Sequence, residues 1–474
     1  MVKKVHQALL KQFPYQPTSG QEELISILSG FIVSSNENGV FIIKGYAGTG
    51  KTTIVGAIVN ALPEFKVKSV LLAPTGRAAK VLSNYSGKAA FTIHKKIYRI
   101  KSAKDDFFNI ALGENLHKNT IFLVDEASMI SDAGNVNDGG LFSGRNLLDD
   151  LFEYVFLGGN CKLILIGDTA QLPPVKLDIS PALDTKYLKT TFNANIQAFE
   201  MKDVVRQSEK SGILMNATSL RNLITNAKVF SPKFDLNNYS DIAHISGADL
   251  GEALENSYSK YGKDETVVIC RSNKRANIYN KQIRSSILYQ ENELSSGDNM
   301  MVVKNNYFWL PEETKAGFIA NGDTIKIIRV LNIQEMYGFR FANVIVSLID
   351  YPDEPDLEVK LLLDTIDSEN PALSYEENQR LFNSIMEDYA EIPNKRKRYL
   401  ELKKNPYFNA LQVKFAYALT CHKSQGGQWK SVFVEQGYLT KDMIDISYLR
   451  WLYTAITRAT EKLYLVNFNM EFFV

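Results

Sequence analysis

The sequence predicts an α/β protein with two domains built on parallel sheets, and with a β module and a helical excursion inserted in the second domain. Short apolar runs alternate with helical patterns, and each run ends in a polar or Gly-rich turn, as in a buried parallel sheet with crossover helices. This alternation is absent from about residue 300 to residue 410, where the sequence predicts short strands and then charged helical segments. The length of 474 residues is about three times a common domain length, which leaves room for this organisation.

The apolar runs fall into two sets, one for each predicted sheet. Between the sets, residues from about Met300 to Asp350 read as short strands with a turn at Asn321-Gly322-Asp323, and residues from about Pro371 to Phe408 read as helical and charged. The expected strands are Val40–Ile43, Ser69–Ala73, Ile121–Val124 and Lys162–Ile166 in the first domain, and Thr266–Cys270, Ser431–Glu435 and Lys462–Val466 in the second, with a helix near Tyr448–Ala459.

These patterns place the first domain at residues 1–200 and the second at 201–299 and 411–474. The inserted module takes residues 300–410. A polar connection at about 95–118 interrupts the first domain, and the Gly/Asn-rich segment Ser131–Gly144 reads as a loop.

Composition narrows the class of protein. With 45% hydrophobic and 23% charged residues, the chain is an ordinary globular protein, not a disordered, collagenous or coiled-coil one. No apolar run approaches the roughly 20 residues that span a bilayer, and the N-terminus is too short in apolar residues for a secretory signal. Three distant cysteines, Cys161, Cys270 and Cys421, make a disulfide framework or a zinc cluster improbable. We therefore expect a cytoplasmic protein without membrane contact.

A Gly-rich loop directly after the Val40–Ile43 strand fits the phosphate-binding pattern G-x-x-x-x-G-K-[ST]. It runs from Gly45 to Thr52 and opens a helical pattern, which is the context that the motif requires. The glycines let backbone N–H groups curve around phosphate oxygens, and the helix N-terminus adds its positive end. Lys51 is expected to reach the β- and γ-phosphates and the Thr52 hydroxyl to bind Mg²⁺. The alternative is a Gly-rich turn without a ligand.

Two acidic residues end the apolar strand Ile121–Val124. Asp125 is the expected Mg²⁺ partner, and Glu126 beside it is placed to orient and deprotonate the attacking water. The alternative is a pair of acids without a role, which the upstream loop argues against. A nucleotide site alone does not say how its energy is used, because kinases, GTPases and transporters share it.

An ordered set of further motifs follows the phosphate loop. The set resembles superfamily 1 helicases, and its GDxxQLPPV and T-x-H-K-S-Q-G forms are similar to the RecD/Dda/Pif branch rather than the UvrD/Rep branch. The resemblance covers nearly the whole chain, and the helical excursion before the second of these forms is most similar to the Dda type. The motifs are Ala73-Pro74-Thr75-Gly76-Arg77-Ala78-Ala79, Thr92-Ile93-His94, Asp125-Glu126-Ala127-Ser128-Met129, Gly167-Asp168-Thr169-Ala170-Gln171-Leu172-Pro173-Pro174-Val175, Val205-Arg206-Gln207, Thr420-Cys421-His422-Lys423-Ser424-Gln425-Gly426 and Tyr453-Thr454-Ala455-Ile456-Thr457-Arg458-Ala459.

The resemblance implies two RecA-like domains with ATP and Mg²⁺ bound between them. Arg206 and Arg458 match positions that bring positive charge to the γ-phosphate, where it stabilises the transition state; the alternative for each is a surface ion pair. Gln171 is expected to sense the γ-phosphate from the first domain and Gln425 from the second. Gln21 matches a glutamine that hydrogen-bonds adenine, since an amide offers a donor and an acceptor. The expected nucleotide-binding set is Gln21, Gly45, Gly48, Thr49, Gly50, Lys51, Thr52 and Thr53.

The resemblance also implies a track for single-stranded DNA across both domains. Binding that ignores sequence uses phosphate contacts with aromatic or apolar stacking. The two histidines in the track could instead be structural. The candidate contacts are Thr75, Arg77, Thr92 and His94 in the first domain and Thr420, His422 and Lys423 in the second, with Asn273 and Lys274 as additions.

The connection at about 95–118 lies where this branch carries its pin, a hairpin that splits the duplex. Phe107 or Phe108 would supply an aromatic tip, and only one of them reaches a tip if they alternate faces on a strand. Two ordinary core phenylalanines are the alternative. The basic run Lys395–Arg398 could touch DNA, although a solvated helical face is favoured. The loop Ser131–Gly144 departs from the family pattern and receives no assignment.

The sequence thus predicts an ATP-dependent DNA helicase that acts as a monomer on single-stranded DNA and duplex junctions, with 5′→3′ polarity carried over from the resemblance. The formal net charge of +1 requires any positive field to be local to a groove. An RNA helicase or protein-displacing translocase remains one alternative. The other is a motor subunit of a larger recombination complex, against which the complete motif set and the expected lack of a nuclease domain argue.

Overall fold

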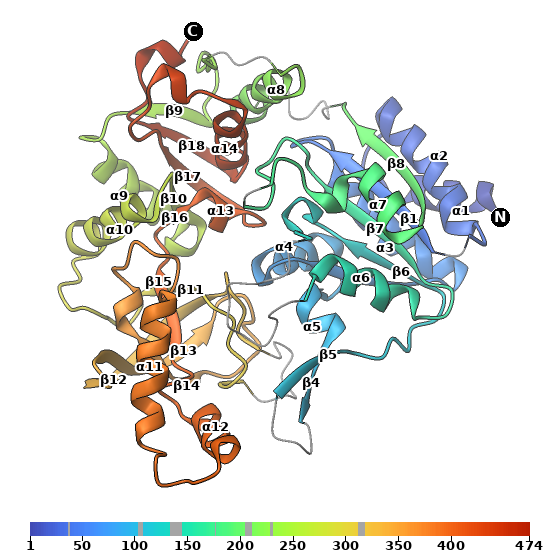
Figure 1. Cartoon of the computed structure of the whole chain (residues 1–474). Coiled ribbons are helices and arrows are strands. Elements are labelled where there is room, and N and C mark those ends of the chain that lie inside the picture. Colours follow the sequence, from blue (N-terminus) through green and yellow to red (C-terminus); the bar gives the residue numbers. More distant parts are fainter. Residues whose placement is uncertain are drawn as a thin grey trace.

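The computed structural model describes residues 1–36, 38–102, 108–132, 145–175, 177–203, 211–227, 231–310 and 318–474. Two parallel sheets lie side by side, and a barrel with two attached helices lies below the second sheet (Figure 1). Among the described residues, no helix has the length and apolar character that a membrane span requires.

The first sheet has six strands, all parallel, in the order β3-β2-β6-β7-β1-β8. Its central strands are apolar on both faces because helices cover both sides. In β1, Phe41 and Ile43 face one apolar cluster, and Val40 and Ile42 face another. The strands are β1 (Gly39–Gly45), β2 (Lys68–Ala73), β3 (Ala90–Thr92), β6 (Thr120–Val124), β7 (Lys162–Gly167) and β8 (Asn195–Met201).

Helices from the N-terminal part of the chain cover this sheet. The short helix α5 leads from β3 into a two-stranded antiparallel hairpin, β4–β5, which projects from the first domain (Figure 1). The helices are α1 (Val2–Lys11), α2 (Ser19–Val33), α3 (Lys51–Ala61), α4 (Gly76–Ser86), α5 (Ile93–Ile97), α6 (Leu147–Phe156) and α7 (Thr185–Phe192), and the hairpin strands are β4 (Tyr98–Ser102) and β5 (Phe108–Leu112).

The second sheet has five parallel strands in the order β16-β10-β17-β18-β9. Strand β10 (Thr266–Cys270) lies between two strands that come about 150 residues later in the chain, because the barrel is inserted after it. The other elements are α8 (Gly212–Thr225), β9 (Ile242–Ile245), α9 (Leu250–Tyr261), α10 (Asn273–Gln282), β16 (Ala418–Thr420), α13 (Cys421–Ser424), β17 (Trp429–Glu435), α14 (Ile446–Ile456) and β18 (Ala459–Val466).

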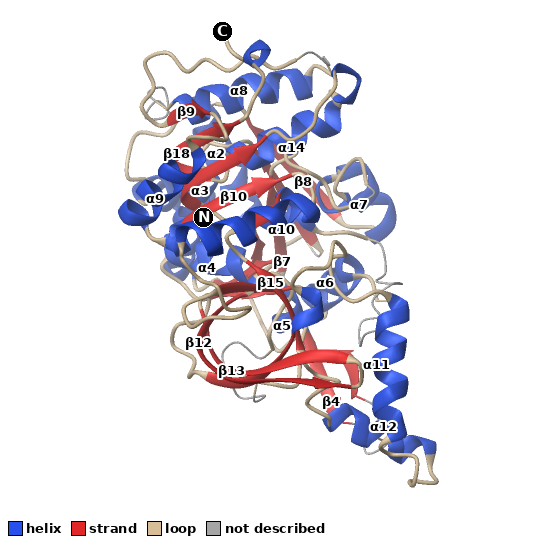
Figure 2. Cartoon of the chain, turned by 90° about the vertical axis from the view of Figure 1, so that its left-hand side faces the viewer, coloured by secondary structure: helices blue, strands red, loops and turns tan. Residues whose placement is uncertain are grey.

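The insertion is a closed five-strand barrel, which Figure 2 shows end-on as a ring. Its first and last strands pair, with Met300 opposite Phe415, so the chain enters and leaves at one place. Two helices pack on the far end of its long hairpin through a cluster that includes Phe341, Ile385 and Leu402. The elements are β11 (Asn299–Val302), β12 (Thr324–Met336), β13 (Phe339–Leu348), β14 (Leu357–Leu362), α11 (Tyr375–Glu387), α12 (Lys395–Lys404) and β15 (Leu411–Phe415).

The predicted fold class of two parallel α/β domains with an inserted β module is confirmed, while some element predictions were wrong. The helix near Tyr448–Ala459 ends at Ile456, and Ala459 already begins β18. The expected short strands after Met300 include one of 13 residues, because β12 extends beyond the barrel as half of a hairpin. Strands β8 and β9 were missed because they lie at sheet edges, where polar residues interrupt the apolar pattern.

Candidate nucleotide-binding cleft and nucleic-acid track

A cleft of about 490 Å³ lies between the two sheet domains. Residues from both domains line it, so a ligand bound there contacts both. The predicted site residues in its wall are Gly48, Gly50, Lys51, Thr52, Thr53, Asp125, Glu126 and Gln171 from the first domain and Arg458 from the second.

The phosphate loop connects β1 to α3. Gly48 and Gly50 have φ angles of 76° and 87°, in the left-handed region where a side chain is disfavoured, so both positions favour glycine. The Lys51 ammonium donates to the carbonyl oxygens of Gly45 and Tyr46, at 2.7 and 2.9 Å. It therefore lies over the loop, the segment whose backbone N–H groups bind phosphate oxygens in this motif.

Gln21 supports this loop from helix α2. Its Nε2 donates to the Thr49 carbonyl at 3.0 Å, while its Oε1 accepts from the Thr18 backbone N–H. The Thr49 hydroxyl in turn donates to the Tyr46 carbonyl at 2.8 Å. In this structure Gln21 is buried with both ends of its amide engaged, one by the phosphate loop and the other by Thr18 at the start of α2.

Asp125 and Glu126 follow β6 at the carboxyl edge of the sheet. Asp125 Oδ2 accepts from the Tyr85 hydroxyl at 2.5 Å, and its Oδ1 accepts from the Glu126 backbone N–H at 2.9 Å. Glu126 has a φ of 53°, which few residues other than glycine adopt. A strained backbone conformation of this kind is found mainly at functional sites, where the surrounding structure holds it in place.

Arg458 brings positive charge from the second domain to Glu126. Its Nη1 lies 3.7 Å from Glu126 Oε1, and the guanidinium is also held by the carbonyls of Thr454 and Gly427. Burial raises the pKa of Glu126, and the charge of Arg458 opposes that rise. A carboxyl with a raised pKa is a better proton acceptor, which suits a general base.

Several hydrogen bonds tie the two domains together beside this pair. The Tyr453 hydroxyl donates to Asp168 at 2.6 Å and accepts from the Ala47 backbone N–H at 2.8 Å. Gln425 donates to the Leu172 carbonyl at 2.7 Å. Gln171 is buried, and its Oε1 has no hydrogen-bond partner within the described part of the chain. An acceptor left open in the cleft wall is available to a ligand.

The oxygen atoms at the cleft suit a magnesium ion. Thr52 offers a hydroxyl and Asp125 a carboxylate with acceptor capacity beyond its two hydrogen bonds. Within the described ranges, no group of three or more His, Cys, Asp or Glu side chains could hold a metal alone. Mg²⁺ commonly binds through one or two protein oxygens together with substrate phosphates and water, and this pair fits that pattern.

In the first domain, the residues predicted to contact single-stranded DNA lie at the beginnings of helices. The Thr75 hydroxyl caps α4 by accepting from Ala78 N–H, and the Thr92 hydroxyl caps α5 by accepting from Lys95 N–H. The Arg77 guanidinium lies 3.9 Å from the ring centroid of Trp429, in the second domain. Burial lowers the pKa of His94 to about 4, so this histidine is neutral at physiological pH.

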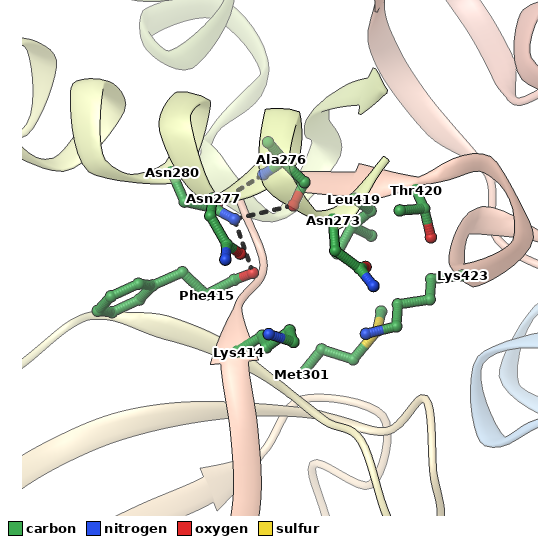
Figure 3. Close-up of a pocket in the computed structure, with 11 residues that line it drawn as sticks. Asn273, Ala276, Asn277, Asn280, Met301, Lys414, Phe415, Leu419, Thr420 and Lys423 are labelled. Carbon is green, nitrogen blue, oxygen red and sulfur yellow. Dashed lines mark hydrogen bonds between the residues drawn. The ribbon is translucent and has the colours of Figure 1, made fainter. Parts of the chain in front are cut away.

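The predicted contacts of the second domain border a small pocket between α10, β16 and the barrel. Thr420 and Lys423 line it together with Asn273, and their side chains extend into the same space (Figure 3). Burial and the nearby charge of Lys414 lower the pKa of Lys423 to about 8. His422 is exposed beside them. With a pKa of about 8, the half-buried ammonium is mostly charged at neutral pH, and an approaching anion favours this charged form further.

Some predicted residues cannot be placed. Arg206, Phe107 and most of the loop Ser131–Gly144 lie outside the described residues. Phe108 is placed only as the first residue of β5.

Sequence reasoning missed two tyrosines that line the cleft, Tyr46 and Tyr85, and a third, Tyr453, that joins the two domains beside it. Tyr453 belongs to a motif that was noticed for its arginine, so a signal for it existed. Tyr46 lies inside the phosphate loop, and its hydroxyl donates to Glu200 at 2.5 Å. Tyr85 had no signal, because a single aromatic residue in a helix normally indicates a core position.

Comparison with known proteins agrees with this geometry. Residues 20–228 match a family described as an AAA domain, and residues 415–466 match the UvrD-like helicase C-terminal domain. The chain is 25% identical to the RecBCD enzyme subunit RecD of Buchnera aphidicola, over 92% of this chain and 71% of RecD. It is 32% identical to the ATP-dependent DNA helicase dda of phage T4, over 43% of this chain and 42% of dda.

A solved structure of the Pif1 helicase from Bacteroides, in complex with ADP-AlF3 and single-stranded DNA, is 16% identical. The match covers 96% of this chain and 95% of the Pif1 chain, with a TM-score of 0.47.

Proposed function

Since the chain belongs to the superfamily 1 helicases of the branch that includes RecD and Dda, we propose that it is an ATP-dependent DNA helicase. In this proposal it moves along single-stranded DNA, 5′→3′, and separates the duplex ahead of it. The observation that supports the proposal most is the cleft, where Glu126 of the first domain and Arg458 of the second lie 3.7 Å apart.

The proposed reaction uses residues of both domains. ATP lies on the phosphate loop, with Lys51 turned from the loop carbonyls to the β- and γ-phosphates. Mg²⁺, held by Thr52 and Asp125, would neutralise phosphate charge. Glu126 accepts a proton from the attacking water, and Arg458 stabilises the charge on the transferred phosphoryl group.

Closure of the cleft links hydrolysis to movement. Arg458 acts only when the second domain is against the first, so hydrolysis and release of phosphate change the distance between the domains. A strand bound across both domains is then displaced in each cycle. In the proposed track, Thr75 and Arg77 hold the strand on one domain, and Thr420, His422 and Lys423 hold it on the other.

The experiment that tests the proposal is unwinding of a DNA duplex with a single-stranded tail at either the 5′ or the 3′ end. We expect ATP-dependent unwinding with the 5′ tail, by a protein that elutes as a monomer in gel filtration. Unwinding with the 3′ tail alone would contradict the polarity. Preference for an RNA duplex would favour the RNA-helicase alternative, and ATPase activity only in a larger complex would favour the motor-subunit alternative.

A further inference from the structure

Helix α4 presents one face to the nucleotide cleft. Ala78, Val81 and Tyr85 all line the cleft, at spacings of three and four residues, which places them on the same side of a helix. Tyr85 is the last of them and the only one with a polar group. Its hydroxyl donates to Asp125 Oδ2 at 2.5 Å.

Asp125 is held from three directions. Its backbone N–H donates to the Leu72 carbonyl at 2.9 Å, which fixes the end of β6 against β2. Its Oδ1 accepts from the Glu126 N–H at 2.9 Å, and its Oδ2 accepts from Tyr85. Of these contacts, only the one from Tyr85 comes from a side chain, and it sets the direction in which Oδ2 presents its remaining lone pair.

We propose that Tyr85 is a positioning residue that orients the Asp125 carboxylate for the magnesium ion of the bound nucleotide. This inference rests on the proposed function of the cleft. Outer hydrogen bonds to a metal-binding carboxylate fix its orientation, and their loss weakens metal binding.

The test is Tyr85→Phe, which removes one oxygen and keeps the ring that packs against the apolar core of the first domain. The measurement is equilibrium binding of a fluorescent ADP at increasing Mg²⁺ concentration, which needs no turnover. We expect the Mg²⁺ concentration at half-saturation to rise by about tenfold, the lower end of the effect of outer hydrogen bonds on metal affinity. Nucleotide binding in the presence of EDTA should stay at the wild-type level.

Tyr98→Phe is the matched control. The Tyr98 hydroxyl donates to Asp150 at 2.6 Å in the same domain, and Asp150 keeps its ion pair with Arg145 at 2.7 Å. Neither Tyr98 nor Asp150 lines the cleft. This variant should therefore bind Mg²⁺ and ADP as the wild type does, with a similar change in melting temperature.

A double-mutant cycle covers the case in which Tyr85→Phe disturbs folding. In an Asp125→Asn background, Tyr85→Phe should have no further effect on the Mg²⁺ dependence, because the two groups act through one contact. The inference is overturned by a wild-type Mg²⁺ dependence in Tyr85→Phe, by an equal change in Tyr98→Phe, or by an undiminished effect in the Asp125→Asn background. Failure of the proposed function is separate: a wild type that binds Mg²⁺ and ADP but does not unwind DNA leaves this test intact.

Discussion

Glu126 occupies an unusual position for a charged residue. It has a left-handed backbone, is largely buried beside Asp125, and faces the guanidinium of Arg458 from the other domain. The burial that raises its pKa would be costly without the arginine, because an unpaired buried charge is unstable. The pair is therefore most stable when the two domains are together.

Replacing Glu126 by Gln should keep ATP binding and slow hydrolysis by about 100-fold or more, the scale of a lost general base. The amide keeps the size and hydrogen-bonding ability of the side chain but accepts no proton. Single-turnover hydrolysis and binding of a fluorescent nucleotide would be measured together. Loss of affinity with normal turnover at saturation would assign Glu126 to binding instead.

Lys51→Ala should abolish ATP hydrolysis and unwinding and leave DNA binding largely intact. The ammonium is the only charge contributed by the phosphate loop, so its loss weakens the interaction with the β- and γ-phosphates. Lys44→Ala, at the end of β1, is the control, because its side chain does not line the cleft. Near-normal turnover in Lys51→Ala would argue against ATP hydrolysis at this site.

At the scale of elements, the barrel packs closely against the beginning of helix α4. A Cβ atom at Gly76 would lie 2.1 Å from Asp323 Oδ1, so only glycine permits this approach. Lys80 adds a hydrogen bond to the Ile349 carbonyl at 2.8 Å. Asp323 is buried, and burial together with the charge of Asp350 raises its pKa to about 8, while Lys95 opposes the rise.

This pKa predicts a pH dependence of stability. Between about pH 4, where an ordinary carboxyl loses its proton, and pH 8, the folded protein retains a proton on Asp323 that the unfolded chain has lost. Stability should therefore fall as pH rises through this range and level off above it. Asp323→Asn should remove this pH dependence. The melting temperature of the variant, relative to that of the wild type, should therefore increase as pH rises. A constant difference, as expected for the exposed Asp356→Asn, would contradict the prediction.

The hairpin β4–β5 is the second element with a predicted role. If Phe107 or Phe108 is a wedge, replacing both with Ala should impair unwinding and spare DNA-stimulated ATPase activity. The loss is limited to the scale of base stacking, roughly 1–3 kcal/mol per base. If both were core residues, each site would cost about 3 kcal/mol or more, and all activities would fall together with the melting temperature.

At the scale of the whole molecule, contacts across the cleft favour the closed arrangement. Tyr453, Gln425 and Arg458 each reach the first domain from the second. A strand that bridges both domains should strengthen this arrangement. Single-stranded DNA should therefore stimulate the ATPase activity, and DNA affinity should fall steeply with salt because phosphate contacts release counterions. No stimulation by any single-stranded DNA or RNA would contradict the motor proposal.

Sequence reasoning predicted the parallel sheets and the phosphate loop because both depend on local patterns. Apolar runs such as Ile121–Val124 are buried on both faces, and the Gly45–Thr52 spacing imposes one geometry. It could not predict the bond from Tyr85 to Asp125 or the approach of Asp323 to Gly76. These contacts join segments that are far apart in the chain, and nothing in either segment marks its partner. The Gln21 contact with Thr49 is of the same kind.

The insertion of the barrel after β10 also affects how the protein is made. On the ribosome, domains fold as they emerge, beginning with the N-terminal one. The first sheet is complete, and the barrel has closed at Phe415, before synthesis reaches Trp429. This residue begins β17, which pairs with β10 in the middle of the second sheet. The nascent chain therefore carries Thr266–Cys270, an apolar strand that is buried on both faces in the finished protein, without partners during much of its synthesis. A ribosome that stalls before Ala418, where the first partner strand β16 begins, would expose this strand to aggregation and to chaperones.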